Sequence, residues 1–226
     1  MIKITPYSQP QGFLAAPPTG KGPGVLVLHA WWGLNDTIKN FCNRLAESGF
    51  VAFAPDLYHG KVATTVADAE VLSKALDSNY QQAQAEVADA ARFLNERVGP
   101  SDQGLAVIGF SLGASYALAV SNAVPEYVRS VVVFYGTWVD DLNNSRAAYL
   151  GHFAENDPFE PQTAVDKLED YVKRIGRPVT FYRYPGAAHW FFEPDRPEYN
   201  PAAATLAWER TLGFLRERAA HPTSQA

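Results

Sequence analysis

Short apolar runs alternate with segments of helical periodicity along most of the chain. The runs are four to six residues long, a length typical of buried strands, and they fall at 25–28, 50–54, 105–108, 130–135, 149–154 and 179–184. Apolar side chains recur at helical spacing within 36–48, 66–98, 165–175 and 208–219. This alternation indicates an α/β fold, with helices on both faces of a mostly parallel, twisted sheet. We expect one domain over residues 1–226, no lid domain, and a disordered tail from about 220 to 226.

Turn and capping residues predict where several elements begin and end. Residues 2–16 break at 9–12, which suggests a two-stranded antiparallel ribbon at a sheet edge. Asp36 or Thr37 can cap the first helix, and a break near 78–79 divides the region 66–98 into two helices. The inner face of the last helix is predicted to carry Trp208, Leu212, Leu215 and Ala219.

Composition and charge disfavour several classes of partner. The net charge is −5 without a lysine or arginine cluster, which argues against nucleic acids and anionic membranes. No apolar run approaches the ~20 residues of a membrane span, and the first residues lack the apolar core of a signal peptide. The single cysteine, Cys42, excludes an intrachain disulfide and is expected on the buried face of a helix. We therefore expect a cytoplasmic protein, monomeric or homodimeric.

The segment 104–121 contains the motif around which a site is predicted. An apolar run leads through Gly109-Phe110-Ser111-Leu112-Gly113 into an alanine-rich helical segment. A strand, G-x-S-x-G and a helix in this order are typical of the nucleophile elbow of α/β-hydrolases. The turn is strained, and a β-carbon at 109 or 113 would press on a neighbouring strand or helix. The alternative is an ordinary small-residue turn between a strand and a helix.

A serine hydroxyl becomes a strong nucleophile when a base removes its proton and an acid orients that base. In the α/β-hydrolase order the acid and the histidine follow the serine, each after a later strand. Asp157 and His189 have these positions, so we expect both at the carboxyl ends of strands beside Ser111. The acids that stay open as alternatives to Asp157 are Glu155, Asp140 and Asp141.

Two backbone donors and a rim of aromatic side chains complete the predicted site. The N–H of Leu112 and that of Trp31 or an immediate neighbour are the expected oxyanion donors. Four tryptophans follow strand ends at one rim, which predicts an aromatic substrate pocket. The expected pocket residues are Trp32, Tyr58, Trp138, Trp190 and Phe192. His189 and Glu193 stand four apart without a second ligand pair, so we expect neither a metal nor another cofactor.

These motifs together resemble the dienelactone hydrolase family of α/β-hydrolases. The resemblance rests on HAWWG at 29–33, PDLY at 55–58, GFSLG at 109–113, the loop that ends in Asp157, and AAHWFF at 187–192. It implies a compact hydrolase that acts on esters or lactones without a lid or a cofactor.

Some residues depart from the pattern of that family. Its prototype has a cysteine nucleophile and a gating glutamate, where this chain has Ser111 and, by ungapped match, Ala30. The prototype's arginines hold a substrate carboxylate, but residues 59–90 contain no arginine, and Glu193 stands near the place of the arginine after the histidine. We therefore expect a neutral or aromatic substrate rather than an anionic dienelactone.

The main hypothesis is a serine hydrolase of small carboxylic esters or lactones that works through an acyl-enzyme. One alternative is a binding protein of the same fold without turnover, and the order of the three site residues counts against it. An acyltransferase or amidase is the other alternative, and it would use the same residues.

Overall fold

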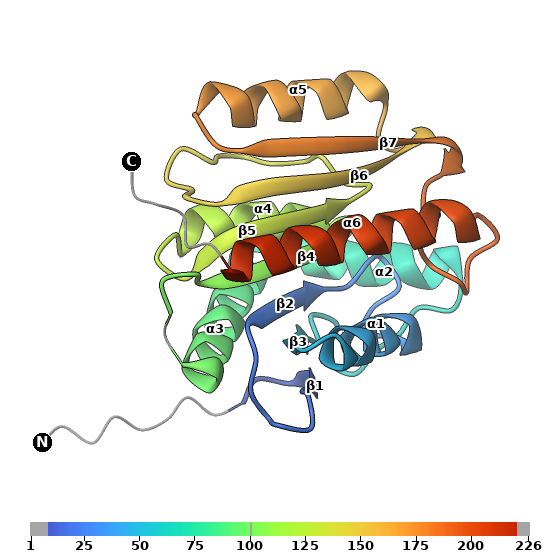
Figure 1. The fold of residues 1–226 in the computed structure, drawn as a ribbon. Coiled ribbons are helices and arrows are strands. Elements are labelled where there is room, and N and C mark those ends of the chain that lie inside the picture. Colours follow the sequence, from blue (N-terminus) through green and yellow to red (C-terminus); the bar gives the residue numbers. More distant parts are fainter. Residues whose placement is uncertain (1–8, 100, 221–226) are drawn as a thin grey trace, which may run out of the picture.

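Seven strands form one sheet in the computed structural model, which describes residues 9–99 and 101–220 (Figure 1). The strands are β1 (Gly12–Ala15), β2 (Gly24–Leu28), β3 (Val51–Pro55), β4 (Leu105–Phe110), β5 (Val128–Phe134), β6 (Ala148–Asn156) and β7 (Val179–Ala188). Their order across the sheet is β1-β3-β2-β4-β5-β6-β7. Only β1 runs antiparallel to its neighbour, and every other pair is parallel. The carboxyl ends of the parallel strands therefore meet at one edge, where ligands bind in such sheets.

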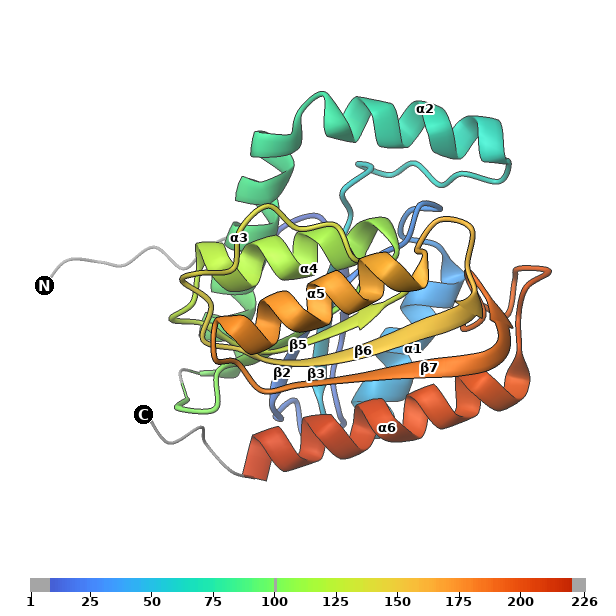
Figure 2. The same ribbon diagram turned by 90° about the horizontal axis from the view of Figure 1, so that it is seen from above.

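Helices cover both faces of the sheet, as the alternation predicts. They are α1 (Asp36–Glu47), α2 (Val66–Asp77), α3 (Tyr80–Val98), α4 (Leu112–Ala123), α5 (Gln162–Arg174) and α6 (Pro201–Ala220). α1 and α6 lie on one face, and α3, α4 and α5 lie on the other (Figures 1 and 2). Figure 2 shows α2 outside α4, on the side away from the sheet. The predicted α/β class and the predicted break between α2 and α3 are both confirmed.

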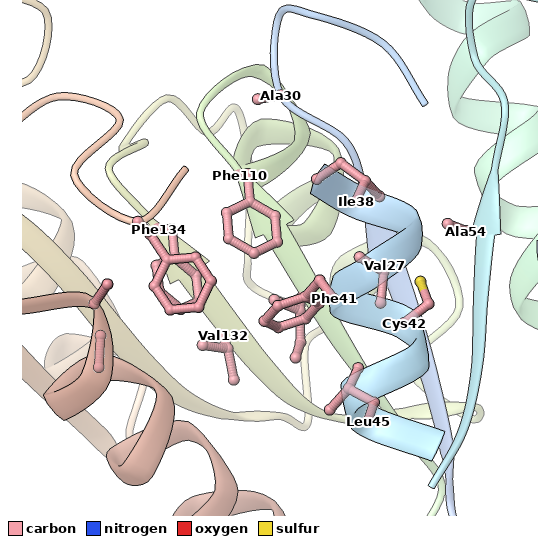
Figure 3. Packing of buried hydrophobic residues seen from close by; sticks show 14 of the residues in the cluster. Val27, Ala30, Ile38, Phe41, Cys42, Leu45, Ala54, Phe110, Val132 and Phe134 are labelled. Atoms are coloured by element: carbon pink, nitrogen blue, oxygen red, sulfur yellow. The ribbon is translucent and has the colours of Figure 1, made fainter. Parts of the chain in front are cut away.

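Strand side chains alternate between two apolar layers. In β2, Val25 and Val27 face the layer of α1 and α6, whereas Leu26 and Leu28 face the layer of α3 and α4. Burial on both faces explains why such a strand reads as an unbroken apolar run. Figure 3 shows the first layer, in which the labelled side chains of α1 (Ile38, Phe41, Cys42 and Leu45) lie beside Val27, Phe110, Val132 and Phe134. Cys42 is buried there, as predicted.

The ends of some elements differ from the predictions. Asn35 caps α1, because its side-chain oxygen accepts a hydrogen bond from Ile38 N at 3.1 Å, and Asp36 and Thr37 lie inside the helix. The strand from the predicted ribbon, β1, pairs with β3, and residues 2–8 lie outside the described residues. Residues 221–226 of the predicted tail also lie outside them.

The inner face of α6 is built mostly from small residues. Its buried positions are Ala203, Ala204, Ala207, Thr211 and Leu215. Leu215 was predicted there, whereas Trp208 and Leu212 are half-buried at the border of the layer. The Arg44 guanidinium lies over the Trp208 ring, 4.0 Å from the ring centroid.

Candidate active site

Ser111 lies at the sharp turn between β4 and α4. Its backbone has φ +50° and ψ −114°, a conformation that is strained for a residue with a side chain. The two glycines of the motif are required by close approach: a β-carbon on Gly113 would lie 2.3 Å from the Leu28 carbonyl oxygen, and one on Gly109 would lie 2.3 Å from the Gly113 carbonyl oxygen. The turn thus lifts the serine hydroxyl above the carboxyl end of the sheet.

His189 and Asp157 meet Ser111 at this edge. Ser111 Oγ lies 2.9 Å from His189 Nε2, and His189 Nδ1 lies 2.7 Å from Asp157 Oδ2. Both side chains beyond the serine are buried, with 4% of the His189 side chain and 1% of the Asp157 side chain exposed. The three residues stand after β4, β6 and β7, so parallel topology brings together side chains that are far apart in sequence.

The Asp157 carboxylate is fixed from two sides. While Oδ2 faces His189, Oδ1 accepts backbone hydrogen bonds from Phe159 N at 2.9 Å and Glu160 N at 3.0 Å. Asp157 therefore opens a turn and orients the histidine at the same time.

The alternative acids are engaged elsewhere. Glu155 accepts from Gly186 N at 2.9 Å, and Asp141 accepts from Asn143 N at 3.0 Å and the Tyr171 hydroxyl at 3.0 Å. Asp140 is exposed. None of these three acids hydrogen-bonds to His189 in the described residues, whereas Asp157 does.

The two expected oxyanion donors lie at positions suited to that role. Leu112 is the first residue of α4, and the first N–H groups of a helix have no acceptor within it. Trp31 follows β2, and its carbonyl oxygen accepts a hydrogen bond from the Tyr58 hydroxyl at 3.2 Å. This hydrogen bond helps to hold the loop after β2 in place, with the Trp31 carbonyl oxygen paired inside the protein. A developing negative charge on a substrate oxygen also gains from the positive end of α4.

Part of the predicted aromatic rim lies beside the histidine. The Trp31 and Trp190 rings are stacked, with centroids 6.5 Å apart and planes 11° apart, and Trp190 contacts the His189 ring at 4.9 Å. Phe159 contacts the same imidazole at 4.9 Å and is 57% exposed. Phe159 was not among the predicted residues, although its place two residues after Asp157 in an acid loop was a usable signal.

The other predicted pocket residues make no ring contact with His189 among the described residues. Phe192 is a core residue, because its ring packs among Phe41, Phe110 and Phe134. Trp32 is also buried, with the Arg196 guanidinium 4.0 Å from its ring centroid, and it packs against the rings of Trp31 and Trp190. Tyr58 is buried and supports Trp31 through its hydroxyl. Trp138 is exposed and packs against Tyr80, at the opposite side of the elbow.

Sequence reasoning also missed a buried polar pair beside the histidine. The Tyr135 hydroxyl donates to Glu193 Oε1 at 2.8 Å, and the Tyr135 ring lies 4.9 Å from the His189 ring. Burial raises the pKa of the Glu193 carboxyl to about 8. The sequence around Glu193 does not indicate that its side chain is buried, because the residue that hydrogen-bonds to it, Tyr135, is 58 positions away.

The remaining described histidines have other surroundings. His152 is buried between the Tyr184 and Thr211 hydroxyls, and burial lowers its pKa to about 3. His29 is buried with Nδ1 2.8 Å from the Ala30 carbonyl oxygen, and His59 lies at the surface beside Glu86. Within residues 9–99 and 101–220, no three His, Cys, Asp or Glu side chains are grouped as metal ligands would be. None of the helices described has both the length and the apolar character needed to cross a bilayer.

Comparison with known proteins identifies the family. Residues 11–219 match the model of the dienelactone hydrolase family. The chain belongs to this family. Among relatives of this dienelactone hydrolase family member, the protein usf of Aquifex pyrophilus is 33% identical over 216 residues, covering 92% of this chain and 93% of its own. A protein of Aquifex aeolicus with the provisional name carboxymethylenebutenolidase is 32% identical, covering 91% of this chain and 92% of its own.

Solved structures confirm the α/β-hydrolase fold of this dienelactone hydrolase family member. A dienelactone hydrolase-like promiscuous phosphotriesterase from metagenomic libraries superposes with a TM-score of 0.76 at 23% identity, over 88% of this chain and 87% of the other. An esterase from Thermogutta terrifontis gives a TM-score of 0.65 at 16% identity, over 90% and 86%. Family membership makes the chain a hydrolase of carboxylic ester bonds, in esters or lactones.

Proposed function

We propose that this enzyme is a serine hydrolase of small esters or lactones in which Ser111 is the nucleophile, His189 the general base and acid, and Asp157 the residue that orients and stabilises the imidazolium. The observation that carries the proposal is the continuous hydrogen-bonded series from Ser111 Oγ to His189 at 2.9 Å and from His189 to Asp157 at 2.7 Å. Such a series is how a serine is activated on unrelated folds.

The reaction proceeds in two half-reactions. As Ser111 Oγ attacks the substrate carbonyl carbon, its proton passes to His189 Nε2, and the C=O electron pair moves to the oxygen. The imidazolium then donates its proton to the leaving alkoxide as the C–O bond breaks, which leaves an acyl-serine. Water then attacks the acyl carbon and gives a proton to His189, and His189 passes that proton to Ser111 Oγ as the bond between Oγ and the acyl carbon breaks and the acid is released. For a lactone, the leaving alkoxide remains attached to the acyl group, so the product is a single hydroxy acid.

The backbone N–H groups of Leu112 and Trp31 are proposed to hold the oxyanion. Backbone donors need no reorganisation when charge develops, and loss of one such donor typically slows acyl transfer about 10²–10³-fold. Their positions at the start of α4 and after β2 support this role.

The aromatic wall at the histidine supports small, uncharged or aromatic substrates on that side. The uncharged rings of Trp31, Trp190 and Phe159 give an apolar surface next to the base. Relatives with lactonase and carboxymethylenebutenolidase names make lactones a natural class to test alongside esters.

Turnover of p-nitrophenyl acetate and of a γ-lactone tests the proposal. Ser111→Ala is expected to lose hydrolysis of both, with an unchanged circular dichroism spectrum. Ser101→Ala, at an exposed turn away from the site, is the matched control and should keep full turnover. Turnover that survives in folded Ser111→Ala protein would refute the proposal. Product analysis with added alcohol or amine separates hydrolysis from acyl transfer, because only transfer yields a new ester or amide.

A further inference from the structure

A cleft beside the elbow has a chemistry that the triad does not use. It has a volume of about 480 Å³, and we call it the Trp138 cleft. Its lining consists of Asp77, Tyr80, Leu112, Ser115, Tyr116 and Trp138. Because Leu112 follows Ser111 directly and Ser115 lies one turn along α4, the cleft borders the candidate nucleophile on the side of α2 and α3. It is therefore placed to receive one end of a substrate whose carbonyl lies at Ser111.

Three of the six residues that line the Trp138 cleft are aromatic. Trp138 packs edge-on against Tyr80, with centroids 5.6 Å apart and planes 81° apart, and Tyr80 contacts Tyr116 at 5.4 Å. Trp138 is 55% exposed although it is a large apolar side chain, so much of its surface is available to a ligand. The faces of tryptophan and tyrosine attract cations through the ring quadrupole, most strongly for tryptophan.

The charge at the Trp138 cleft is negative. Asp77 is the last residue of α2, and the carboxyl end of a helix favours a cation. In the part of the chain that the structure describes, Asp77 has no ion-pair partner, and no lysine or arginine is among the cleft residues. Burial raises the pKa of Asp77, because its carboxylate is partly shielded from water.

Other acidic side chains near the Trp138 cleft add to its negative charge. Burial is the main cause of the raised pKa of the Tyr80 and Tyr116 phenols, and nearby carboxylates add to it: Asp77 for both, Asp140 for Tyr80 and Glu86 for Tyr116. An anion in the cleft would meet like charges, whereas a cation would be stabilised by Asp77 and by the rings together.

We infer that the Trp138 cleft binds the cationic, ammonium-type end of an ester substrate, with Asp77 and Trp138 as the residues that determine this specificity. The inference rests on the proposed function, since it places the ester carbonyl at Ser111. The preferred substrate then carries a positive charge, whereas a lactone with a carboxylate carries a negative one.

Three acetate esters of similar size test the inference. They are acetylcholine, its uncharged isostere 3,3-dimethylbutyl acetate, and the anion 4-acetoxybutanoate. Because only the charge differs greatly within this set, kcat/KM measured by pH-stat isolates its effect. We expect kcat/KM for the cation to exceed that for the isostere about tenfold, a ratio in the range of a desolvated cation–π contact assisted by a carboxylate, and the anion to be slowest.

Variants then assign the preference to the Trp138 cleft. Asp77→Asn and Trp138→Leu are expected to bring the ratio of cation to isostere close to one. Asp102→Asn, at the opposite end of β4, alters the net charge equally and should keep the full ratio. Thermal unfolding confirms that each variant is folded.

The possible outcomes separate the two proposals. Vinyl acetate hydrolysis that depends on Ser111, together with equal rates for cation and isostere, overturns the cleft inference and leaves the proposed function intact. A cation preference that Asp77→Asn and Trp138→Leu leave unmoved also overturns it. Absence of Ser111-dependent hydrolysis of every ester overturns both proposals.

Discussion

The Tyr135 hydroxyl donates a hydrogen bond to Glu193 Oε1 at 2.8 Å, and the Tyr135 ring lies against the His189 imidazole. Tyr135 follows β5 with φ +38°, a strained backbone for a bulky side chain, and is fully buried. Glu193 is only 1% exposed. The pair thus ties the histidine loop to the strand beside the nucleophile, in the interior rather than in the substrate site.

Glu193→Gln is expected to stabilise the protein increasingly as the pH rises from 5 to 8. Burial raises the folded pKa of Glu193 from 4.5 to about 8, so the folded chain holds a proton that the unfolded chain releases in this window. Its contribution to stability is therefore greatest below about pH 4.5 and falls until about pH 8. Glutamine keeps an acceptor for Tyr135 and does not titrate. Urea unfolding at several pH values measures the difference, and a difference that is constant with pH would contradict the account.

The contact of Ser111, His189 and Asp157 could be predicted from the sequence because it follows from topology. Each residue comes directly after a parallel strand, and the carboxyl ends of such strands share one edge. The crowding at Gly109 and Gly113 could also be predicted, because the G-x-S-x-G turn leaves no room for a β-carbon at either position.

Trp31 and Trp190 could be predicted at the site, but the phenylalanines could not be sorted into site and core. Phe159 comes two residues after Asp157 and Phe192 three after His189, yet Phe159 is 57% exposed beside His189 and Phe192 is 6% exposed in the core. Trp190 has φ +62° and lies in the turn between His189 and Phe192. The residues around position 190 in the sequence predict neither this positive φ nor the hydrogen bond between Glu193 and Tyr135.

Gly113→Ala is expected to reduce both stability and activity. The new methyl group would meet the Leu28 carbonyl oxygen at 2.3 Å, so α4 or β2 must shift, at a cost of about 1–3 kcal/mol. Gly213→Ala is the matched control, because a β-carbon there meets nothing within 4 Å on the surface of α6, and it should stabilise by about 0.5–1 kcal/mol. Unfolding curves and ester turnover measure both variants. Equal stability of the two would argue against a crowded elbow.

Asp157→Asn is expected to lower kcat about 10³–10⁴-fold while the fold is retained. The amide no longer offers a charge to stabilise the His189 imidazolium, and it favours the wrong tautomer of the ring. Glu155→Gln, two residues away, changes charge equally but keeps an acceptor for Gly186 N and should have little effect on kcat. If the two variants lose activity to a similar degree, Asp157 has no special role.

Cys42 is expected to be inert in the folded protein. The thiol is buried in the layer under α1, and burial raises its pKa to about 12, so thiolate is scarce near neutral pH. Iodoacetamide at pH 8 should modify Cys42 only after urea unfolding, as measured by mass spectrometry. Rapid modification without urea would show that this layer opens readily.

The most direct measurement of the central claim is covalent labelling of the folded enzyme by a fluorophosphonate probe, followed by peptide mapping. The account predicts one adduct, on Ser111, that is absent from Ser111→Ala protein and forms about 10²-fold or more slowly in His189→Ala protein. An unlabelled Ser111 in the folded enzyme, or an adduct whose rate does not depend on His189, would contradict it.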